Sequence, residues 1–542
     1  MLETVNAVLD THNQVAAASH GDLETIRSLV SLMLTATIVG VIAARIKLPY
    51  TVSLVLVGIG LNALGILPNL KLTPDLLLMV FLPALLFEAA IHFPANELKQ
   101  FAPTIIVLAV PGVLLTALVT AFVLQIEFST FRLAQPVGFT HFLLFGTIIA
   151  ATDPISVISL LRQLGVNRKL SVLIEGESLF NDGTAIVLYT LVLDMITMGR
   201  LNLSTSFVQL IVVSLGGIFI GAILGLFASL VISFMEDHLF SIAITTVTAY
   251  GTYLSAEEFQ VSGILATVVA GLFVGNMGKK KSMNPMTRIA VTSFWEYLAF
   301  FISSIVFLMM GLEVNLLLLL NHIELIIFAF CAVLASRAAS VFLPIPFLRR
   351  FNQNIDYRNG TVLWWSGLRG SLSMVLVLSL PQDMEVREIL VAMTFGVVVL
   401  SVVLQGTTIG LFLKWLKLVP IRTEASIFLA KNLARLKAIK AQTEAISQMS
   451  FTELPVAKEI SLRLKTERAE ILKILEDKSQ DPEFLNAASH RINTIEKRLE
   501  DVAKASYRES LEASLLTDKD MQELTSTLLT ASEAKMNDAG KT

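Results

Sequence analysis

Long apolar runs recur through most of this 542-residue chain and restrict its possible folds more than any other feature. Each run has about 18 or more residues, which is enough to cross a bilayer as a helix. A helix satisfies its own backbone hydrogen bonds, as a segment in lipid must. Charged residues make up only 16% of the chain, against about a quarter in soluble domains, so a soluble fold is excluded. The sequence therefore predicts an all-α polytopic membrane protein.

About thirteen candidate spans can be placed between residues 27 and 419. They cover roughly residues 27–45, 50–67, 74–92, 102–125, 141–162, 171–198, 207–235, 239–256, 262–278, 290–318, 323–345, 359–381 and 388–417. Basic residues concentrate in the loops that follow odd-numbered spans, for example at 279–281, Arg349 and Arg350. Because cytoplasmic loops are rich in Lys and Arg, the N-terminus is predicted outside the plasma membrane and the C-terminus in the cytoplasm.

The composition divides the chain into three parts. Residues 1–26 are polar and lack the basic start of a signal peptide, so they are predicted to be an extracytoplasmic segment. The membrane domain is predicted at 27–419. Residues 420–542 contain charged stretches with apolar residues three and four apart, which predict a cytoplasmic domain of amphipathic helices with a disordered end. This tail has no GxGxxG motif, so no nucleotide-binding domain is expected. A packing or dimer-supporting role is favoured over a ligand sensor, and the lean loops favour a bacterial origin.

Asp153 lies within the fifth apolar span, in the stretch ATDPIS. An ionisable residue at membrane depth is costly and usually faces a cavity or a partner. Pro154 lacks a backbone donor and pushes the residue before it out of helical geometry. The helix is therefore predicted to break there and to free carbonyls near Ala151 and Thr152, as transporters do around ion sites. The alternative is a simple proline kink with a snorkelling aspartate.

The next span contains the polar stretch IEGESLFNDG, residues 174–183. Ser178 and Asp182 are four residues apart, so they share one face of a helix. Glu177 and Asn181 are also four apart and form the adjacent face. One face thus presents a hydroxyl and a carboxylate, and its neighbour presents an acid and an amide.

These side chains could bind a small cation. A hard cation needs several oxygen ligands in place of its water shell, a rule stated for calcium and magnesium that we extend to Na⁺. Asp153, Asp182, the Ser178 hydroxyl and the freed Thr152 carbonyl would supply such a set. Two carboxylates in a medium of low dielectric repel each other, which favours a proton on one of them. A proton and a cation would then compete for the same oxygens, which is the physical requirement for exchanging one against the other.

Three further charged residues lie inside apolar spans and need partners. Glu177 could be neutralised by Arg337, in VLASRAAS, or by Arg369, in SGLRGS, and the sequence does not decide between them. For all three, a structural ion pair is favoured over direct contact with the ion. Glu88, in FLPALLFEAAIHF, is near the inner end of the third span. An interfacial position and a role in the site, direct or through water, are equally consistent with it.

The joint occurrence of ATDP, GESLFND and GLRGS resembles the NhaP/NHE branch of the monovalent cation/proton antiporters. FLPALLFEAA and VSGILATVVAGLFVGN also look like that branch, and the resemblance covers roughly residues 27–420. It implies an antiporter fold with inverted repeats, in which the broken fifth and twelfth spans cross near the midplane. It also implies a dimer subdomain, a moving core subdomain and a homodimer. The partners expected are the lipid bilayer and a second copy of the chain, with no nucleic acid.

The resemblance also implies roles for individual residues. Ion ligation would fall to the Thr152 backbone and to the side chains of Asp153, Ser178 and Asp182. Asn181 would support the site, Glu88 would reach it through water, and Glu177 would pair with an arginine, Arg337 or Arg369. An Asn–Asp pair at 181–182, in place of two aspartates, looks like the electroneutral branch. One-for-one exchange is therefore implied, with transported ions and no cofactor.

The function predicted is a secondary antiporter that exchanges Na⁺, or Li⁺ or K⁺, for H⁺ by alternating access. An intramembrane aspartyl protease using Asp153 and Asp182 is a second class. The FNDG stretch, however, lacks the GxGD pattern associated with such proteases. A passive channel is a third class, but no carbonyl filter of the TVGYG kind occurs. The sequence therefore predicts a transporter and not an enzyme.

Overall fold

The computed structural model describes the chain with several gaps. The described residues are 27–28, 30–46, 48–65, 73–131, 137–198, 203–235, 237–350, 355–419, 423–448, 455–478, 481 and 484. Their regular elements are all helices, which confirms the predicted all-α class. The predicted extracytoplasmic segment, 1–26, and the predicted disordered end, from about 530, lie outside the described residues.

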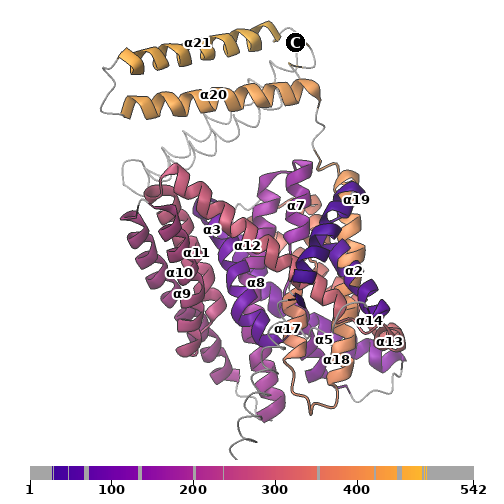
Figure 1. Ribbon diagram of the computed structural model, residues 1–542. Coiled ribbons are helices and arrows are strands. Elements are labelled where there is room, and N and C mark those ends of the chain that lie inside the picture. Colours follow the sequence, from indigo (N-terminus) through magenta and orange to yellow (C-terminus); the bar gives the residue numbers. More distant parts are fainter. Residues whose placement is uncertain are drawn as a thin grey trace, which may run out of the picture. The chain divides into compact units, whose positions relative to one another are not determined.

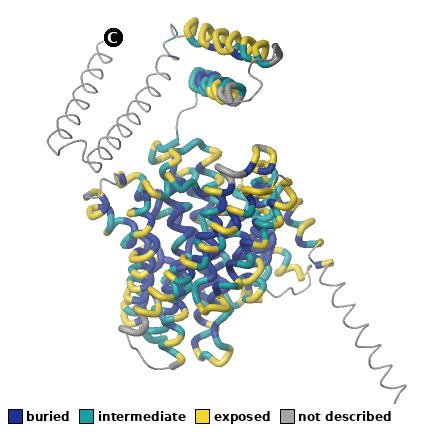
Figure 2. Tube along the Cα trace, turned by 90° about the vertical axis from the view of Figure 1, so that its left-hand side faces the viewer, coloured by how far each residue is buried: buried dark blue, intermediate teal, exposed yellow. Residues whose placement is uncertain are grey.

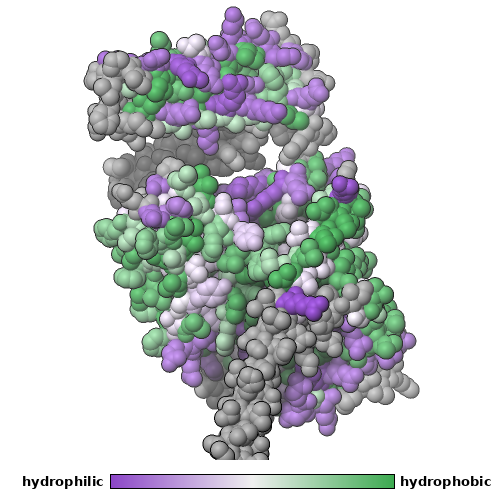
Figure 3. Space-filling view, in the orientation of Figure 1, coloured by the Kyte–Doolittle hydropathy of each residue, from purple (hydrophilic) through white to green (hydrophobic). Residues whose placement is uncertain are grey.

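The chain separates into two compact units, Met1–Val419 and Pro420–Thr542. We call them the membrane unit and the tail unit. In the membrane unit, eight described helices are long and apolar enough to cross a bilayer. Shorter apolar helices occupy Val30–Ile46, Tyr50–Leu64, Leu76–His92 and Gly263–Gly278. Figure 3 shows mainly apolar side chains across the visible face of this unit, with hydrophilic ones gathered near its two ends. The count of thirteen crossings stays a prediction.

The helices of the membrane unit pack as two groups, with more extensive contacts within each group than between them. The first, which we call the α11 group, includes the adjacent helices α9 to α11 in Figure 1. Its members are α2 (Tyr50–Leu64), the π-helical turn η1 (Leu76–Phe81), α3 (Leu82–His92), α9 (Leu203–Ser233), α10 (His238–Glu258), α11 (Gly263–Phe273), the π-helical η2 (Val274–Ser282) and α12 (Pro285–Leu312).

The second group contains two interrupted helices, and we call it the crossing group. Its members are α4 (Ala95–Ala109), α5 (Pro111–Phe131), α6 (Phe139–Ala150), α7 (Ile155–Leu164), α8 (Arg168–Met198), α13 (Leu316–Asn321), α14 (Ile323–Phe342), α15 (Ile345–Arg350), α16 (Tyr357–Trp365), α17 (Ser371–Leu378), α18 (Arg387–Leu400), η3 (Ser401–Gln405) and α19 (Gly406–Trp415). Buried positions concentrate in the interior of the membrane unit, as the dark segments in Figure 2 show.

The fourth predicted span, 102–125, lies within one apolar helical stretch, Ala95–Thr130, which contains a joint. Two helices, α4 and α5, occupy residues 95–131 and meet at Val110 and Pro111. Pro111 has no N–H to donate to the preceding turn, so the helical hydrogen-bond ladder is interrupted there. The apolar composition continues on both sides of this joint, so the sequence predicts one span across it.

Close backbone approach joins α9 to α11. A Cβ atom at Gly217 would lie 3.2 Å from the Ser262 side chain, and one at Gly225 would lie 2.7 Å from the Cα of Ala270. Small residues at four-residue spacing let helix backbones approach in this way. The glycines of α9 therefore serve helix packing.

The tail unit contains two described helices, α20 (Glu424–Gln448) and α21 (Pro455–Asp477). Ile439 of α20 packs with Leu464 and Ile471 of α21 in a small apolar core. Arg435 donates to Glu467 across the pair at 2.9 Å. Apolar residues spaced three and four apart place one stripe of each helix against the other, as the sequence pattern indicates.

Candidate functional site

Two helices of the crossing group are interrupted at mid-length. Helix α6 ends at Ala150 and α7 begins at Ile155, with residues 151–154 non-helical between them. Helix α16 ends at Trp365 and α17 begins at Ser371. The first break falls at the predicted proline, since Pro154 cannot donate to the preceding turn. The two breaks in the fold are those predicted for the fifth and twelfth spans.

The two breaks meet each other. The backbone N–H of Asp153 donates to the carbonyl of Leu368 at 2.8 Å. A Cβ atom at Gly370 would overlap the Cβ of Asp153 and would lie 2.9 Å from its Oδ2 atom. Only a residue without a side chain fits there, because the backbone of the second break passes directly against the Asp153 side chain.

Arginines hold the carbonyl ends of both interrupted helices. Nη1 of Arg369 donates to the carbonyls of Ala150 and Ala151, at 3.0 and 3.4 Å, where α6 ends. Nη2 of Arg337 donates to the carbonyl of Leu363 at 3.0 Å, in the last turn of α16. The carboxyl end of a helix carries partial negative charge and free carbonyls, so a cation stabilises it. The two arginines therefore satisfy the carbonyls of Ala150, Ala151 and Leu363 at these ends.

Helix α8 brings two polar side chains to the first break. The Ser178 hydroxyl donates to the Thr152 carbonyl at 2.6 Å. Nδ2 of Asn181 donates to the Thr152 hydroxyl at 2.7 Å. Thr152, Ser178 and Asn181 are all buried, with exposed fractions of 6, 7 and 1%. The predicted freeing of the Thr152 carbonyl has thus occurred, and its partner is one of the predicted ligands.

The two aspartates lie close to this junction. Asp182 follows Ser178 by one turn of α8, so the two side chains lie on the same face of the helix. Oδ1 of Asp153 accepts the N–H of Ile155 at 3.0 Å, which fixes the carboxylate at the start of α7. Both aspartates are partly buried. Carboxylate, hydroxyl and carbonyl oxygens therefore converge where the two breaks touch.

Glu177 forms its ion pair with Arg337. Both of its carboxylate oxygens accept from this guanidinium, Oε2 from Nη2 at 2.9 Å and Oε1 from Nη1. Only 3% of the Glu177 side chain and 8% of the Arg337 side chain are exposed. The sequence left Arg337 and Arg369 open as partners, and the bidentate contact singles out Arg337. This ion pair joins α8 to α14.

Comparison with known proteins places this arrangement in a family. The model of the transmembrane sodium/hydrogen exchanger family matches residues 32–415. The chain belongs to the sodium/hydrogen exchanger family. The exchanger is therefore a secondary transporter and not an enzyme. This confirms the predicted transporter and excludes the alternative of an intramembrane aspartyl protease.

Relatives and a solved structure agree with this membership. The Na⁺/H⁺ antiporter ApNhaP of Aphanothece halophytica is 38% identical over 397 residues, which is 73% of this chain and 74% of that protein. The low-affinity Na⁺/H⁺ antiporter NhaS1 of Synechocystis sp. is 36% identical, covering 80% of this chain and 83% of that protein. The sodium proton antiporter MjNhaP1 of Methanocaldococcus jannaschii shares the fold, with a TM-score of 0.60 and 20% identity over 72% of this chain and 98% of that chain. The predicted NhaP-type resemblance is confirmed.

Glu88 of the exchanger lies in a separate charged cluster. His92 Nδ1 is 3.2 Å from Glu88 Oε1 and 2.8 Å from the Glu88 carbonyl. The charge of Glu88 acts on Glu175, which pairs with Arg162 at 2.7 Å. Among the described residues, no hydrogen bond or ion pair joins Glu88 to either site aspartate. Its predicted contribution through water stays a prediction.

The exchanger shows features that the sequence did not signal. The hydroxyl of Ser401, in η3, accepts the backbone N–H of Arg369 at 3.1 Å and helps to hold the second break. The carbonyl that accepts the Asp153 N–H belongs to Leu368, an ordinary apolar residue. A serine and a backbone carbonyl carry no distinguishing pattern, so their roles depend on the fold alone.

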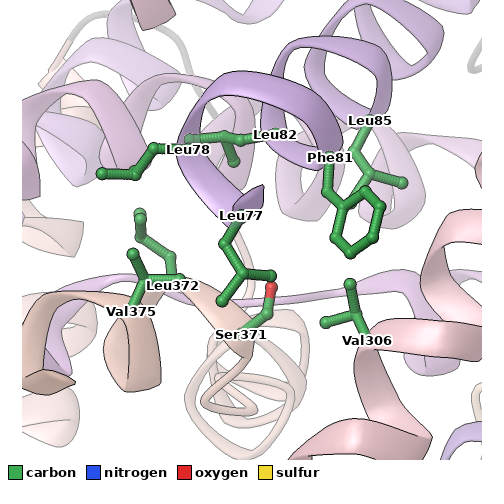
Figure 4. Close-up of a pocket in the computed structure, with 9 residues that line it drawn as sticks. All are labelled: Leu77, Leu78, Phe81, Leu82, Leu85, Val306, Ser371, Leu372 and Val375. Carbon is green, nitrogen blue, oxygen red and sulfur yellow. The ribbon is translucent and has the colours of Figure 1, made fainter. Parts of the chain in front are cut away.

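An apolar seam joins the two helix groups beside the second break. Figure 4 shows its side chains around a small cavity, contributed by η1 and α3 on one side and by α17 on the other, with α12 adjoining. The lining residues are Leu77, Leu78, Phe81, Leu82, Leu85, Val306, Ser371, Leu372 and Val375. Ser371 directly follows Gly370, so the seam begins next to the site. Its lining side chains other than Ser371 offer water no hydrogen bonds.

Several buried polar atoms near the junction have no protein partner among the described residues. They are Asn181 Oδ1, the Nε atom of Arg337 and the Nε and Nη2 atoms of Arg369. Buried polar groups usually find a partner, often an ordered water. In the described part of the chain, no cluster of three or more His, Cys, Asp or Glu side chains could hold a metal ion. A cation at this junction would therefore depend on two carboxylates together with neutral oxygens.

Proposed function

We propose that this exchanger transports Na⁺ in exchange for H⁺, one for one, with Asp153, Asp182, Ser178 and the Thr152 carbonyl as the cation ligands. The observation that carries the proposal is the Ser178–Thr152 contact, which joins the helix that carries Asp182 to the break that carries Asp153. The names of the relatives, which are Na⁺/H⁺ antiporters, support Na⁺ as the cargo.

The hydrogen-bond directions suit a cation. The proton of the Ser178 hydroxyl is used toward the Thr152 carbonyl, so the Ser178 oxygen keeps its lone pairs for a ligand role. A carbonyl oxygen has two lone pairs, and the one not used by Ser178 is available. Ionised carboxylates only accept hydrogen bonds. Each of the four groups can therefore present a negative or partly negative oxygen to a hard cation.

The buried charges support a one-for-one stoichiometry. The ionisable side chains around the two breaks are Arg337, Arg369, Glu177, Asp153 and Asp182. With all of them ionised, two positive and three negative charges leave a net charge of −1. One Na⁺ neutralises this charge, and so does one proton. Because an unbalanced charge in a medium of low dielectric is costly, states holding one Na⁺ or one proton are favoured over an empty site.

Access to the site would alternate through movement of the crossing group against the α11 group. The apolar seam closes one route to the junction, because its lining excludes water. Residues 76–85 belong to the half of the predicted third span nearer the outside, so we assign the seam to the outer route. The distribution of Lys and Arg supports a plasma-membrane topology with the N-terminus outside. A homodimer is supported by the family resemblance.

Transport by the purified protein in sealed proteoliposomes tests this function. An outward Na⁺ gradient is expected to drive proton entry, and clamping the membrane potential at different values should not change the rate. Parallel series with Li⁺ and K⁺ define the cargo. Proton flux driven by K⁺ but not by Na⁺ would show that the transported cation is K⁺ and not Na⁺. A rate that follows the clamped potential would refute one-for-one exchange, and a current without proton coupling would indicate a channel.

A further inference from the structure

The chain passes between the two helix groups at three connections. Residues 93–94 join α3 of the α11 group to α4 of the crossing group, and residues 313–315 join α12 to α13. The third connection, residues 199–202, lies outside the described part of the chain. Hinges in proteins are a few residues at the ends of elements that absorb the change in backbone angles. A movement of one group against the other, as proposed above, therefore has to bend the chain at these connections.

The first connection ends one helix and begins the next, so its backbone groups lack helical partners. The carbonyl of Phe93 follows the last turn of α3, and the N–H of Ala95 opens α4. Asn276, in η2, satisfies both groups. Its Oδ1 accepts the Ala95 N–H at 2.9 Å, and its Nδ2 donates to the Phe93 carbonyl at 3.0 Å. One side chain of the α11 group thus holds the chain on both sides of Pro94.

Asn276 is itself fixed within the α11 group. It ends the stretch VSGILATVVAGLFVGN, residues 261–276, which takes no part in the proposed ion site. An amide nitrogen has two N–H donors, and the second one of Asn276 donates to the carbonyl of Leu272 at 2.9 Å, one turn earlier. A Cβ atom at Gly275 would overlap the carbonyl of Ile91, so the backbone that carries Asn276 lies directly against α3. The amide therefore has a fixed position relative to the end of α3.

The chain has room to turn around this point. A cavity of about 230 Å³ adjoins the connection, and its lining includes Phe93, Pro94, Asn276 and Arg288 of α12. Close-packed protein interiors resist displacement. An unfilled space beside the connection therefore lets the start of α4 swing about the point that Asn276 holds.

The second connection is held in the same way, but by one hydrogen bond. Nδ2 of Asn62, in α2, donates to the Val314 carbonyl at 3.0 Å. Helix α2 lies directly against α12, because a Cβ atom at Gly311 would overlap the carbonyl of Val55. In the proposed topology this connection is at the outer end of the membrane unit, and residues 93–94 are at the inner end. At each end, an asparagine of the α11 group therefore holds the chain where it enters the crossing group.

We propose that Asn276 and Asn62 are positioning residues that fix the pivots about which the crossing group turns during exchange. This proposal rests on the proposed function, because alternating access requires the movement. Asn276 keeps the inner bend at Pro94, and Asn62 keeps the outer bend at Val314. Neither side chain is a ligand of the ion. Both should therefore affect how fast the two groups change position and not how tightly Na⁺ binds.

Kinetic measurements separate a pivot from an ion ligand. In proteoliposomes, Asn276→Ala should lower the maximal rate of Na⁺-driven proton flux severalfold and leave the half-maximal Na⁺ concentration unchanged. Asn62→Ala should have the same effect to a smaller degree, because it removes one hydrogen bond in place of three. Asn62 is exposed, so this variant also supplies the test if Asn276→Ala does not fold. The control is Asn167→Ala, which removes a hydrogen bond to the N–H of Lys169 within the crossing group and should leave the rate unchanged.

A distance measurement tests the pivot without transport. In a Cys331→Ser background, spin labels are attached to Lys99→Cys in α4 and Met286→Cys in α12, two exposed positions on different groups. Asn276→Ala should widen the distribution of distances between the labels, because the start of α4 is no longer held. The matched pair, Leu239→Cys and Met286→Cys, lies within the α11 group and should keep its wild-type width. Because no ion gradient is needed, this result decides on the pivot even if Na⁺/H⁺ exchange itself is refuted.

Four results would overturn the proposal. Equal widths of the 99–286 distribution with and without Asn276→Ala would show that Asn276 does not hold the start of α4. Wild-type maximal rates in both alanine variants would show that the held connections do not govern exchange. A half-maximal Na⁺ concentration that rises as the rate falls would place the effect at the ion site. An equal loss of rate in Asn167→Ala would show a general effect of lost hydrogen bonds.

Discussion

The backbone N–H of Asp153 is bonded to the carbonyl of Leu368, so a proposed ligand residue is held directly by the second interrupted helix. Gly370 lies against the side chain of the same aspartate. The two breaks therefore form one structural unit, and a substitution that displaces one break should also displace the other. This unit is the basis of the first prediction.

Gly370→Ala should damage transport strongly. The new methyl group would overlap the Cβ of Asp153, and overpacking of this kind costs about 1–3 kcal/mol and moves the side chain. We expect a lower melting temperature in detergent and a severalfold or larger loss of Na⁺-driven proton flux. The control is Gly251→Ala in α10, where the added atom meets nothing within 4 Å. Wild-type flux in the Gly370→Ala protein would show that the junction tolerates displacement of Asp153.

Asp182→Asn should abolish exchange while the protein still folds. The amide has nearly the same size as the carboxylate, but it neither ionises nor exchanges a proton. Proteoliposome flux is therefore expected to fall to background. Asp194→Asn provides a control on the same helix, because Asp194 is exposed and lies three turns farther along. If Asp182→Asn kept most of its Na⁺-dependent flux, Asp182 could not be the titrating ligand.

Asp153→Asn should weaken cation binding and preserve the break. Its amide oxygen can still accept the N–H of Ile155, so the local fold needs no change. Loss of one negative ligand should lower the apparent Na⁺ affinity by on the order of tenfold or more. The measurement is the Na⁺ concentration that gives half-maximal flux, with circular dichroism as the check on folding. An unchanged half-maximal concentration would argue against ligation by Asp153.

Glu177→Gln should affect stability more than ion binding. It leaves Arg337 buried without its counter-charge, which costs about 3–5 kcal/mol. Yield and melting temperature should fall, and the protein that remains should lose less apparent Na⁺ affinity than the Asp153→Asn protein. A second change, Arg337→Met, should recover part of the loss, because it removes the stranded charge.

The control for this prediction is the neighbouring acid. Glu175 pairs with Arg162, whose side chain is 65% exposed, and exposed pairs contribute about 0–1 kcal/mol. Glu175→Gln should therefore leave the melting temperature nearly unchanged. A stable Glu177→Gln protein that selectively lost Na⁺ binding would instead place Glu177 among the ligands.

Acid pH should weaken apparent Na⁺ affinity. If one Na⁺ displaces one proton, protons occupy the carboxylates at low pH and Na⁺ must compete with them. In the acid range the half-maximal Na⁺ concentration should rise about tenfold for each unit of pH decrease, and at alkaline pH it should level off. Isothermal titration in buffers of different ionisation enthalpy counts the released protons. Binding of Na⁺ without proton release at any pH would contradict the competition.

Much of the site could be predicted because its main features leave marks on the sequence. Pro154 predicts the first break, and the family resemblance carried by GLRGS predicts the second. Four-residue spacing places Ser178 and Asp182 on one face of α8. The choice of Arg337 over Arg369 for Glu177 could not be predicted, since both arginines lie in apolar spans and spacing does not reveal which helix packs on α8.

Other features left no usable signal. The Leu368 carbonyl that accepts the Asp153 N–H is a backbone group, and every residue has such a carbonyl. The leucines of the seam sit among many other apolar residues, so nothing distinguishes a closing contact from a lipid-facing side chain. Pro111 did carry a signal for the joint between α4 and α5, but uniform apolar composition on both sides concealed it.

All the oxygens assigned to the cation come from α8 and the α6–α7 break, within the crossing group. A displacement between the two helix groups can therefore open the bound ion to a different aqueous compartment while its inner shell stays intact. With the proposed ligands, selectivity and sidedness are set by separate parts of the protein, and substitutions along the contact between the groups should alter the turnover rate without changing which ion is carried.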